Sequence, residues 1–165
     1  MNKYTIIIPI HNERDAIPAL INNLEDYNKN GHEIIIIDDG SNDGSQDLLI
    51  QYDFINIISL KSNLGKGTAI KNGLMKASNK KIILFDGDME LNPSEISNLM
   101  ILDKAKGIQC VFGSRFRKLS PFSSLWNLGN YFFILLFYFI HNKKYNDILC
   151  CAKAFYKMDI IPAKL

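Results

Sequence analysis

Short apolar runs alternate with amphipathic segments along most of this chain. Residues 4–10 are β-branched and almost continuously apolar, and the four isoleucines at 34–37 repeat the pattern. Such runs are typical of strands buried on both faces of a sheet. The same criterion predicts five strands, at residues 4–10, 33–37, 54–60, 81–85 and 109–112.

The intervals between these runs have helical spacing. Ile17, Leu20, Ile21 and Leu24 recur at i, i+3, i+4 and i+7, and the nearby Pro18 falls in the first turn, where proline is tolerated. Further helices are predicted at 45–52, 68–78 and 93–104. Ser45 and Asn92 are the expected N-caps of two of them.

Strands that alternate with helices predict an α/β fold, in which helices sandwich a mostly parallel sheet. Ligands of such sheets bind beyond the carboxyl ends of the strands. Polar clusters follow four of the predicted strands, so we expect them to meet at one edge. They are His11-Asn12-Glu13, Asp38-Asp39, Asp86-Gly87-Asp88 and Gly113-Ser114-Arg115.

Composition narrows the class of protein. A chain of 165 residues suits one well-buried domain, and a net charge of +2 gives no reason to expect nucleic-acid binding. Three cysteines without a Cys-x-x-Cys pair predict neither disulfides nor a zinc site, and they suit a reducing cytosol. The N-terminus leads directly into the first strand, which does not resemble a signal peptide.

The Asp86-Gly87-Asp88 motif is the strongest candidate for chemistry. Two carboxylates one residue apart repel each other unless a cation or several donors lie between them. Mg²⁺ and Mn²⁺ prefer oxygen ligands and take one or two carboxylates together with substrate phosphates. Glu90 offers another oxygen, and Gly87 permits close approach of a ligand. A solvated acidic turn is the alternative interpretation.

Each of the other polar segments has more than one possible role. Asp39 is placed to accept hydrogen bonds from a base or ribose, whereas Asp38 suits the turn that leads into the next helix. The segment from Asn63 to Thr68 lacks the spacing of a phosphate loop, and Lys66 is expected to face solvent or phosphate. Arg115 either braces a phosphate or is simply exposed.

A long uncharged segment covers residues 119–142. Its fully apolar part, residues 131–140, is too short to span a bilayer, and Lys or Arg residues flank both ends. An aromatic-rich helix with cationic ends is typical of a helix lying in a membrane interface. A buried core helix is the alternative.

In order and spacing, these motifs resemble the family 2 glycosyltransferases with the GT-A fold, a Rossmann-like fold that binds nucleotide-diphospho-sugars. The likeness is greatest to the branch that transfers mannose or glucose to dolichyl or other polyprenyl phosphates. The motifs are Ile8-Pro9-Ile10-His11-Asn12-Glu13, Ile37-Asp38-Asp39-Gly40-Ser41, Asn63-Leu64-Gly65-Lys66-Gly67, Phe85-Asp86-Gly87-Asp88-Met89-Glu90, Gly113-Ser114-Arg115-Phe116, Leu128-Gly129-Asn130 and the stretch 147–155.

The resemblance implies a role for each matching residue. The nucleoside pocket would be lined by Pro9, His11, Glu13, Ile37 and Asp39. Asp86 and Gly87 would contact the donor, Asp88 and Glu90 would hold Mg²⁺ or Mn²⁺, and Arg115 would steady the phosphates. Asp88 and Asp147 are the catalytic candidates, with Asp147 orienting the acceptor.

The implied activity is inverting transfer of a sugar from a GDP- or UDP-linked donor to a polyprenyl phosphate, at the cytoplasmic face of a membrane. Residues 1–118 would form the nucleotide-sugar core, and 119–165 a short acceptor-side and membrane-proximal part of the same domain. Cys151-Ala152 replaces the Gly-Phe of relatives, and relatives continue beyond the length of this chain. A nucleotide-sugar-binding module that needs a further segment or a partner chain for activity is the alternative.

Overall fold

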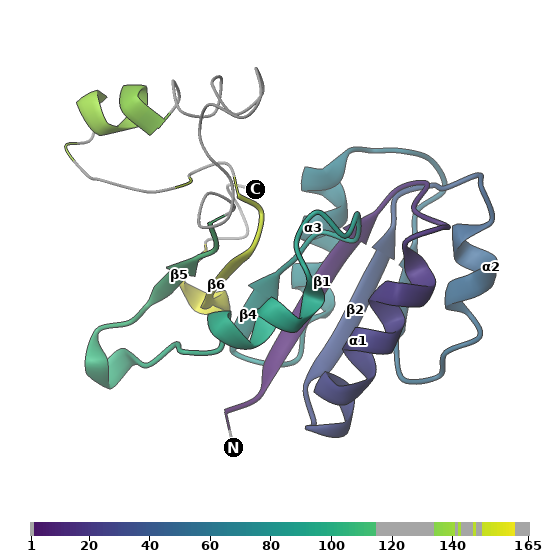
Figure 1. The fold of residues 1–165 in the computed structure, drawn as a ribbon, viewed down its shortest axis with the longest axis horizontal. Helices are drawn as coiled ribbons and strands as arrows, with labels where there is room; N and C mark the ends of the chain where they lie inside the picture. Colours follow the sequence, from purple (N-terminus) through teal and green to yellow (C-terminus); the bar gives the residue numbers. More distant parts are fainter. Residues whose placement is uncertain (1, 115–133, 141, 143–146, 148–149, 161–165) are drawn as a thin grey trace.

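The computed structural model describes residues 2–114, 134–140, 142, 147 and 150–160. These residues form a six-stranded sheet in the order β3-β2-β1-β4-β6-β5 (Figure 1). The strands are β1 (Tyr4–Ile10), β2 (Glu33–Asp38), β3 (Asn56–Ser59), β4 (Lys81–Leu84), β5 (Cys110–Phe112) and β6 (Lys153–Tyr156). The first four are parallel neighbours, which confirms the predicted α/β class.

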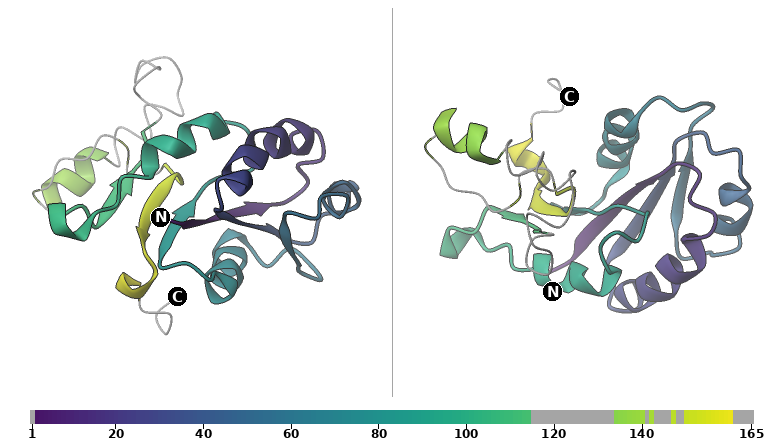
Figure 2. Two further views of the ribbon diagram at one scale, coloured as in Figure 1. Left: turned by 90° about the horizontal axis from the view of Figure 1, so that it is seen from below. Right: turned by 45° about the horizontal axis from the view of Figure 1, so that its top comes forward.

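Helices cover both faces of this sheet, and the isoleucine runs explain why. Ile6, Ile8 and Ile10 of β1 face α1 (Ile17–Lys29), α2 (Ser45–Leu49) and the 3₁₀ helix η1 (Pro93–Leu99). Ile7 between them faces α3 (Lys66–Lys76) on the other side. Successive side chains of a strand point to opposite faces of the sheet. Because helices cover both faces here, β1 needs apolar residues on both of its faces. The view from below in Figure 2 shows α1 and α3 on opposite sides of the sheet.

The far edge of the sheet differs from the predicted parallel arrangement. β6, which the sequence analysis did not predict, inserts between β4 and β5 and pairs antiparallel with both. β5 was predicted, but in the structure it joins the sheet by pairing with β6. The sheet is therefore mixed, and residues from the end of the chain lie beside the strand that leads to Asp86.

Several helix boundaries also differ from the predictions. The expected helix at 93–104 is the shorter η1, since the chain turns to bury Leu102, whose N–H donates to the Tyr4 hydroxyl at 3.1 Å. Asn92 is its N-cap as predicted. Ser45 is not the cap of α2, because Gly44 holds that position in the left-handed region. Two further 3₁₀ turns are η2 (Lys104–Lys106) and η4 (Lys157–Asp159).

The predicted apolar helix is described only in part. Residues 134–140 are helical, and Leu135, Leu136, Tyr138, Phe139 and Ile140 are exposed. This part of the segment therefore does not belong to the core. Within the described residues, no helix has the length and apolarity needed to cross a bilayer. Residues 119–133 and 141 of the segment lie outside the described residues, as does Arg115.

Candidate functional site

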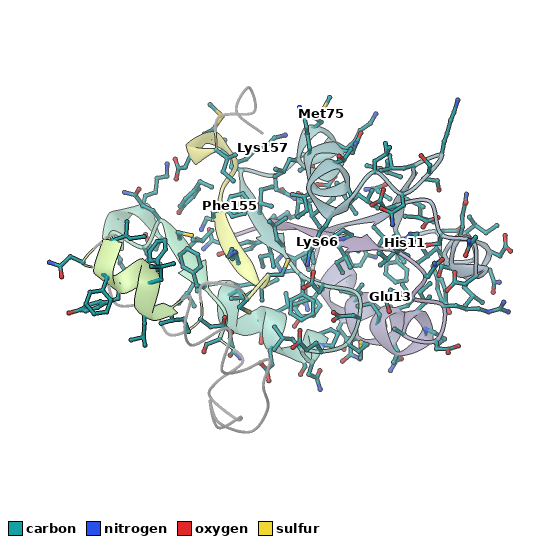
Figure 3. The ribbon with its side chains drawn as sticks, turned by 90° about the horizontal axis from the view of Figure 1, so that it is seen from above. His11, Glu13, Lys66, Met75, Phe155 and Lys157 are labelled. Atoms are coloured by element: carbon teal, nitrogen blue, oxygen red, sulfur yellow. The ribbon has the colours of Figure 1, made fainter. Side chains whose placement is uncertain are left out.

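A cleft of about 200 Å³ opens at the carboxyl ends of the parallel strands. The loops after β1, β2 and β4 supply most of its walls, and the start of α3 supplies the rest. The predicted residues that line it are Pro9, His11, Glu13, Asp39, Asp86, Gly87 and Asp88. Three of the four polar clusters therefore meet at one edge, as the strand pattern predicts. Viewed from above, His11, Glu13 and Lys66 lie at this edge (Figure 3).

The turn after β1 is fixed by contacts with the turn after β2. Asn12 takes a positive φ of 57°, a conformation that asparagine tolerates better than most residues. Its N–H donates to the Ser41 hydroxyl at 2.8 Å, and its side-chain oxygen accepts from the Asn42 N–H at 2.9 Å. The Glu13 N–H donates to the Ser45 hydroxyl at 3.1 Å. His11 and Glu13 consequently enter the cleft from a rigid support.

The two aspartates after β2 have different surroundings. The Asp38 carboxylate accepts from the Ser41 N–H at 3.0 Å, which confirms the prediction that it serves the turn. Asp39 is buried but lines the cleft, and its Oδ1 accepts from the Leu64 N–H at 2.8 Å. Asp39 thus anchors the loop before α3 and also faces the space where a ligand would lie.

The Asp86-Gly87-Asp88 loop turns sharply after β4. Asp88 is exposed, and its Oδ1 accepts from the Glu90 N–H at 2.9 Å. Gly87 was expected to admit a ligand, but packing already requires the glycine. A Cβ at this position would lie 2.5 Å from Cγ2 of Ile10, so only glycine lets the loop rest on β1. This contact brings Asp86 and Asp88 to the cleft.

Carboxylates concentrate negative charge in the cleft. Burial raises the pKa of Glu13, the carboxylates of Asp88, Asp43 and Asp86 raise it further, and His11 acts in the opposite direction. In the described part of the chain, no three His, Cys, Asp or Glu side chains converge on a point suited to a metal ion. The charge distribution therefore suits a divalent cation only if phosphate oxygens complete its coordination.

Comparison with known proteins decides the family. The family model described as "Glycosyl transferase family 2" matches residues 5–159, nearly the whole chain. The chain belongs to glycosyl transferase family 2. An undecaprenyl-phosphate 4-deoxy-4-formamido-L-arabinose transferase of Yersinia pestis is 36% identical over 108 residues. The match covers 61% of this chain and 33% of that protein, so the chain spans about a third of the length of the curated relatives it matches.

Solved glycosyltransferases share the fold at low sequence identity. Mannosyl-3-phosphoglycerate synthase from Rubrobacter xylanophilus superposes with a TM-score of 0.75 at 14% identity, over 94% of this chain and 53% of that one. Glucosyl-3-phosphoglycerate synthase from M. tuberculosis has a TM-score of 0.73 at 20% identity, over 94% and 57%. These matches confirm the GT-A fold expected from the sequence.

Lys66, which lines the cleft, and Cys151, which contacts Lys66 and Asp86, were not among the predicted site residues. The Lys66 ammonium lies 2.5 Å from Oδ1 of Asp86, and the Cys151 thiol hydrogen-bonds to both side chains. Burial and the Asp86 carboxylate raise the pKa of Cys151 to about 11, which keeps the thiol neutral. The polar Gly65-Lys66-Gly67 segment was the available signal for Lys66. Cys151 lies in the 147–155 stretch that carries the resemblance, but its contact with Lys66 and Asp86 could not be predicted because β6 was not predicted.

Three predicted site residues lie elsewhere. Ile37 is fully buried beneath α3, next to Gly73, and its side chain does not line the cleft. Glu90 is exposed after the Asp86–Asp88 loop and is not among the lining residues. Asp147 is buried, and its carboxylate accepts from the Cys150 N–H at 3.0 Å. The structure thus assembles the donor-side candidates but not the full predicted set.

Proposed function

We propose that this chain carries the donor site of a metal-dependent, inverting glycosyltransferase that moves a sugar from a UDP- or GDP-linked donor to a polyprenyl phosphate. The observation that carries the proposal is the convergence of Glu13, Asp86 and Asp88 with His11 and Asp39 in one cleft. Membership of glycosyl transferase family 2 supports the reaction class. The named Yersinia relative, a transferase to undecaprenyl phosphate, supports the acceptor class.

The nucleoside would occupy the side of the cleft formed by the first two strands. His11 offers a flat ring for a base to stack on, and Pro9 adds an apolar wall. Asp39 would accept a hydrogen bond from a base or ribose with the oxygen that does not hold Leu64. Glu13 lines the same cleft, and the charges of Asp88, Asp86 and His11 all act on its carboxyl group.

The diphosphate would lie near Asp86 and Asp88. Asp88, together with Glu90 of the same loop, would hold Mg²⁺ or Mn²⁺ against the phosphates. Such an ion supplies Lewis acidity that stabilises negative charge on the departing nucleoside diphosphate. Burial and then the nearby carboxylates raise the pKa of Glu13, and carboxylates crowded in one cleft favour a bound cation, which supports the fit.

Transfer would follow a single displacement. A phosphate oxygen of the acceptor would attack the anomeric carbon on the face opposite the leaving diphosphate. The bond between that carbon and the diphosphate oxygen would break as the new bond forms, which inverts the anomeric configuration. The acceptor is already anionic, so the step needs little help from a general base. Asp147 would then act by positioning the acceptor, and Arg115, outside the described residues, would steady the leaving diphosphate.

The exposed apolar residues of 134–140 support a place at a membrane surface, where a polyprenyl phosphate is found. Phe139 is 80% exposed and Ile140 is 66% exposed. Apolar side chains of this size are suited to lie at the boundary between headgroups and acyl chains. We therefore propose peripheral association with the cytoplasmic face of the membrane.

The decisive experiment measures sugar transfer and donor binding together. The chain is incubated with UDP- and GDP-sugars, Mn²⁺ and a polyprenyl phosphate, and released nucleoside diphosphate is measured. Asp88→Asn keeps the shape of the side chain and removes its charge, so it should abolish release and weaken binding with Mn²⁺ far more than binding in EDTA. Tight donor binding without any release would favour the binding-module alternative. Equal loss in Mn²⁺ and EDTA would remove Asp88 from the metal site.

A further inference from the structure

An ion pair crosses the floor of the proposed donor cleft. Lys66, the first residue of α3, and Asp86, two residues after β4, both line the cleft, with Nζ and Oδ1 2.5 Å apart. Burial lowers the pKa of Lys66, but the hydrogen bond to Asp86 and the neighbouring charges more than compensate, so the lysine is cationic. The cleft therefore contains a positive charge that the acidic residues hold in place.

We propose that Lys66 changes partners when the donor binds: its ammonium leaves Asp86 and contacts the diphosphate. The inference rests on the proposed function and names a positioning residue for it. A lysine side chain is a point charge on a flexible stem, and this one is half exposed, so the movement needs no change in the backbone. In the empty cleft the ammonium neutralises a carboxylate that would otherwise repel phosphate.

The surroundings of Lys66 suit an anion at its new position. The N-terminus of an 11-residue helix carries partial positive charge, and Lys66 begins that helix. Gly65 and Gly67 on either side have no atom within 4 Å of the position a Cβ would take, so a ligand has room to approach. Both features lie next to the same ammonium group.

The exchange also frees Asp86. Once its cation has moved to the phosphate, the Asp86 carboxylate is available to accept from hydroxyl groups of the donor. The Cys151 thiol, which hydrogen-bonds to both side chains, brings no charge of its own, because its pKa is raised to about 11. The partner change therefore involves one cation and two anions, the carboxylate and the diphosphate.

The first arm of the test measures affinity in EDTA, so that no divalent cation contributes. UDP, GDP and their nucleosides are titrated calorimetrically into wild type, Lys66→Met and Lys76→Met. Lys76 lies at the exposed end of α3 and controls for loss of one charge from the same helix. We expect Lys66→Met to weaken diphosphate binding about tenfold and leave the nucleoside unaffected. Lys76→Met should match wild type.

The second arm is a double-mutant cycle with Asp86→Asn. If Asp86 restrains Lys66, Asp86→Asn should improve diphosphate binding in a protein that has Lys66. The improvement should be at least about threefold greater there than in the Lys66→Met background. Zero coupling, or a Lys66→Met variant that binds the diphosphate like wild type, would overturn the partner change while leaving the donor site intact. A wild type that binds neither diphosphate, in EDTA or with Mn²⁺ present, would instead overturn the proposed function itself. Melting temperatures verify that each variant is folded.

Discussion

Nδ1 of His11 lies 2.8 Å from the carbonyl oxygen of Asp39, and this contact joins the ends of two neighbouring strands. A carbonyl oxygen only accepts, so Nδ1 carries the proton. Nε2 is then free to accept from the Asn12 side-chain amide at 3.3 Å. Two contacts thus fix the plane of a ring that lines the cleft, and the proposed function would use that ring to stack on a base.

His11→Ala should weaken binding of the nucleoside monophosphate, because the stacking surface is lost. Replacing a stacked aromatic by alanine costs about 1–3 kcal/mol, or roughly 5- to 150-fold in affinity. His11→Phe keeps a flat ring and should retain most of the affinity. Calorimetric titration with UMP and GMP measures both. Equal weakening by the two substitutions would assign the effect to the hydrogen bonds and not to stacking.

Glu13→Gln should raise the melting temperature at neutral pH. Burial and the neighbouring carboxylates raise the pKa of Glu13 in the folded state, so its ionisation opposes folding at pH values above that pKa. Below the unfolded value of about 4.3, both states are protonated and the difference disappears. Thermal melts from pH 4 to pH 8 without metal therefore should diverge as the pH rises.

The exposed Asp53→Asn variant is the control for this pH series, because it also removes one carboxylate. It should not reproduce the divergence. Added Mn²⁺ and nucleoside diphosphate should reverse the order and stabilise wild type more than Glu13→Gln. A gain in melting temperature that is the same at pH 4 and pH 8 would mean that charge repulsion at Glu13 has no part in it.

Gly73→Ala should destabilise the fold, although alanine favours helices. A Cβ at Gly73 would lie 2.6 Å from Cγ2 of Ile7 and 2.8 Å from Cδ1 of Ile37, both in the sheet beneath α3. Overpacking of this kind costs about 1–3 kcal/mol, against a helix-propensity gain of up to about 1 kcal/mol. Gly67→Ala, in the same helix with open space around it, should lose no stability. Urea titration separates the two.

Phe139→Asp should release the protein from anionic vesicles while the fold stays intact. Burying one large apolar side chain contributes about 1.5–3 kcal/mol, so vesicle affinity should fall about tenfold or more. Met158→Asp is the control, since Met158 is equally exposed but lies outside the apolar helix. Replacing Arg117, Lys118, Lys143 and Lys144 by Gln should have a similar effect. A wild type that ignores these vesicles in sedimentation would exclude the membrane proposal.

Continuous burial made the first half of the fold predictable from sequence. β1 has the predicted limits, residues 4–10, because seven successive buried positions leave little choice of structure. The meeting of three polar clusters at one edge was also predictable, because parallel strands all end at the same edge of the sheet. β6 escaped prediction because four residues of mixed polarity, Lys153–Tyr156, form a strand only beside β4, some seventy positions earlier in the chain.

The location of the candidate site was predictable where residues closely follow a buried parallel strand, as for Asp86, Asp88 and His11, which line the cleft. The site was not predictable where it depends on contacts between residues far apart in the sequence. Lys66 and Asp86 are twenty positions apart, and no local pattern indicates their contact. Ile37 was assigned to the nucleoside pocket by resemblance, yet α3 covers its side chain, which packs against Gly73.

The position of β6 between β4 and β5 has a consequence for the order of folding. β5 has no ladder with β4, so it stays unpaired until the ribosome has delivered residue 156. Until then, the edge of β4 that pairs with β6 in the folded protein also has no partner strand. A nascent chain halted near residue 118 would therefore expose a strand edge beside the donor cleft, where it is prone to pair with other chains. The first four strands and the later segment that contains β6 therefore depend on each other for a fully paired sheet.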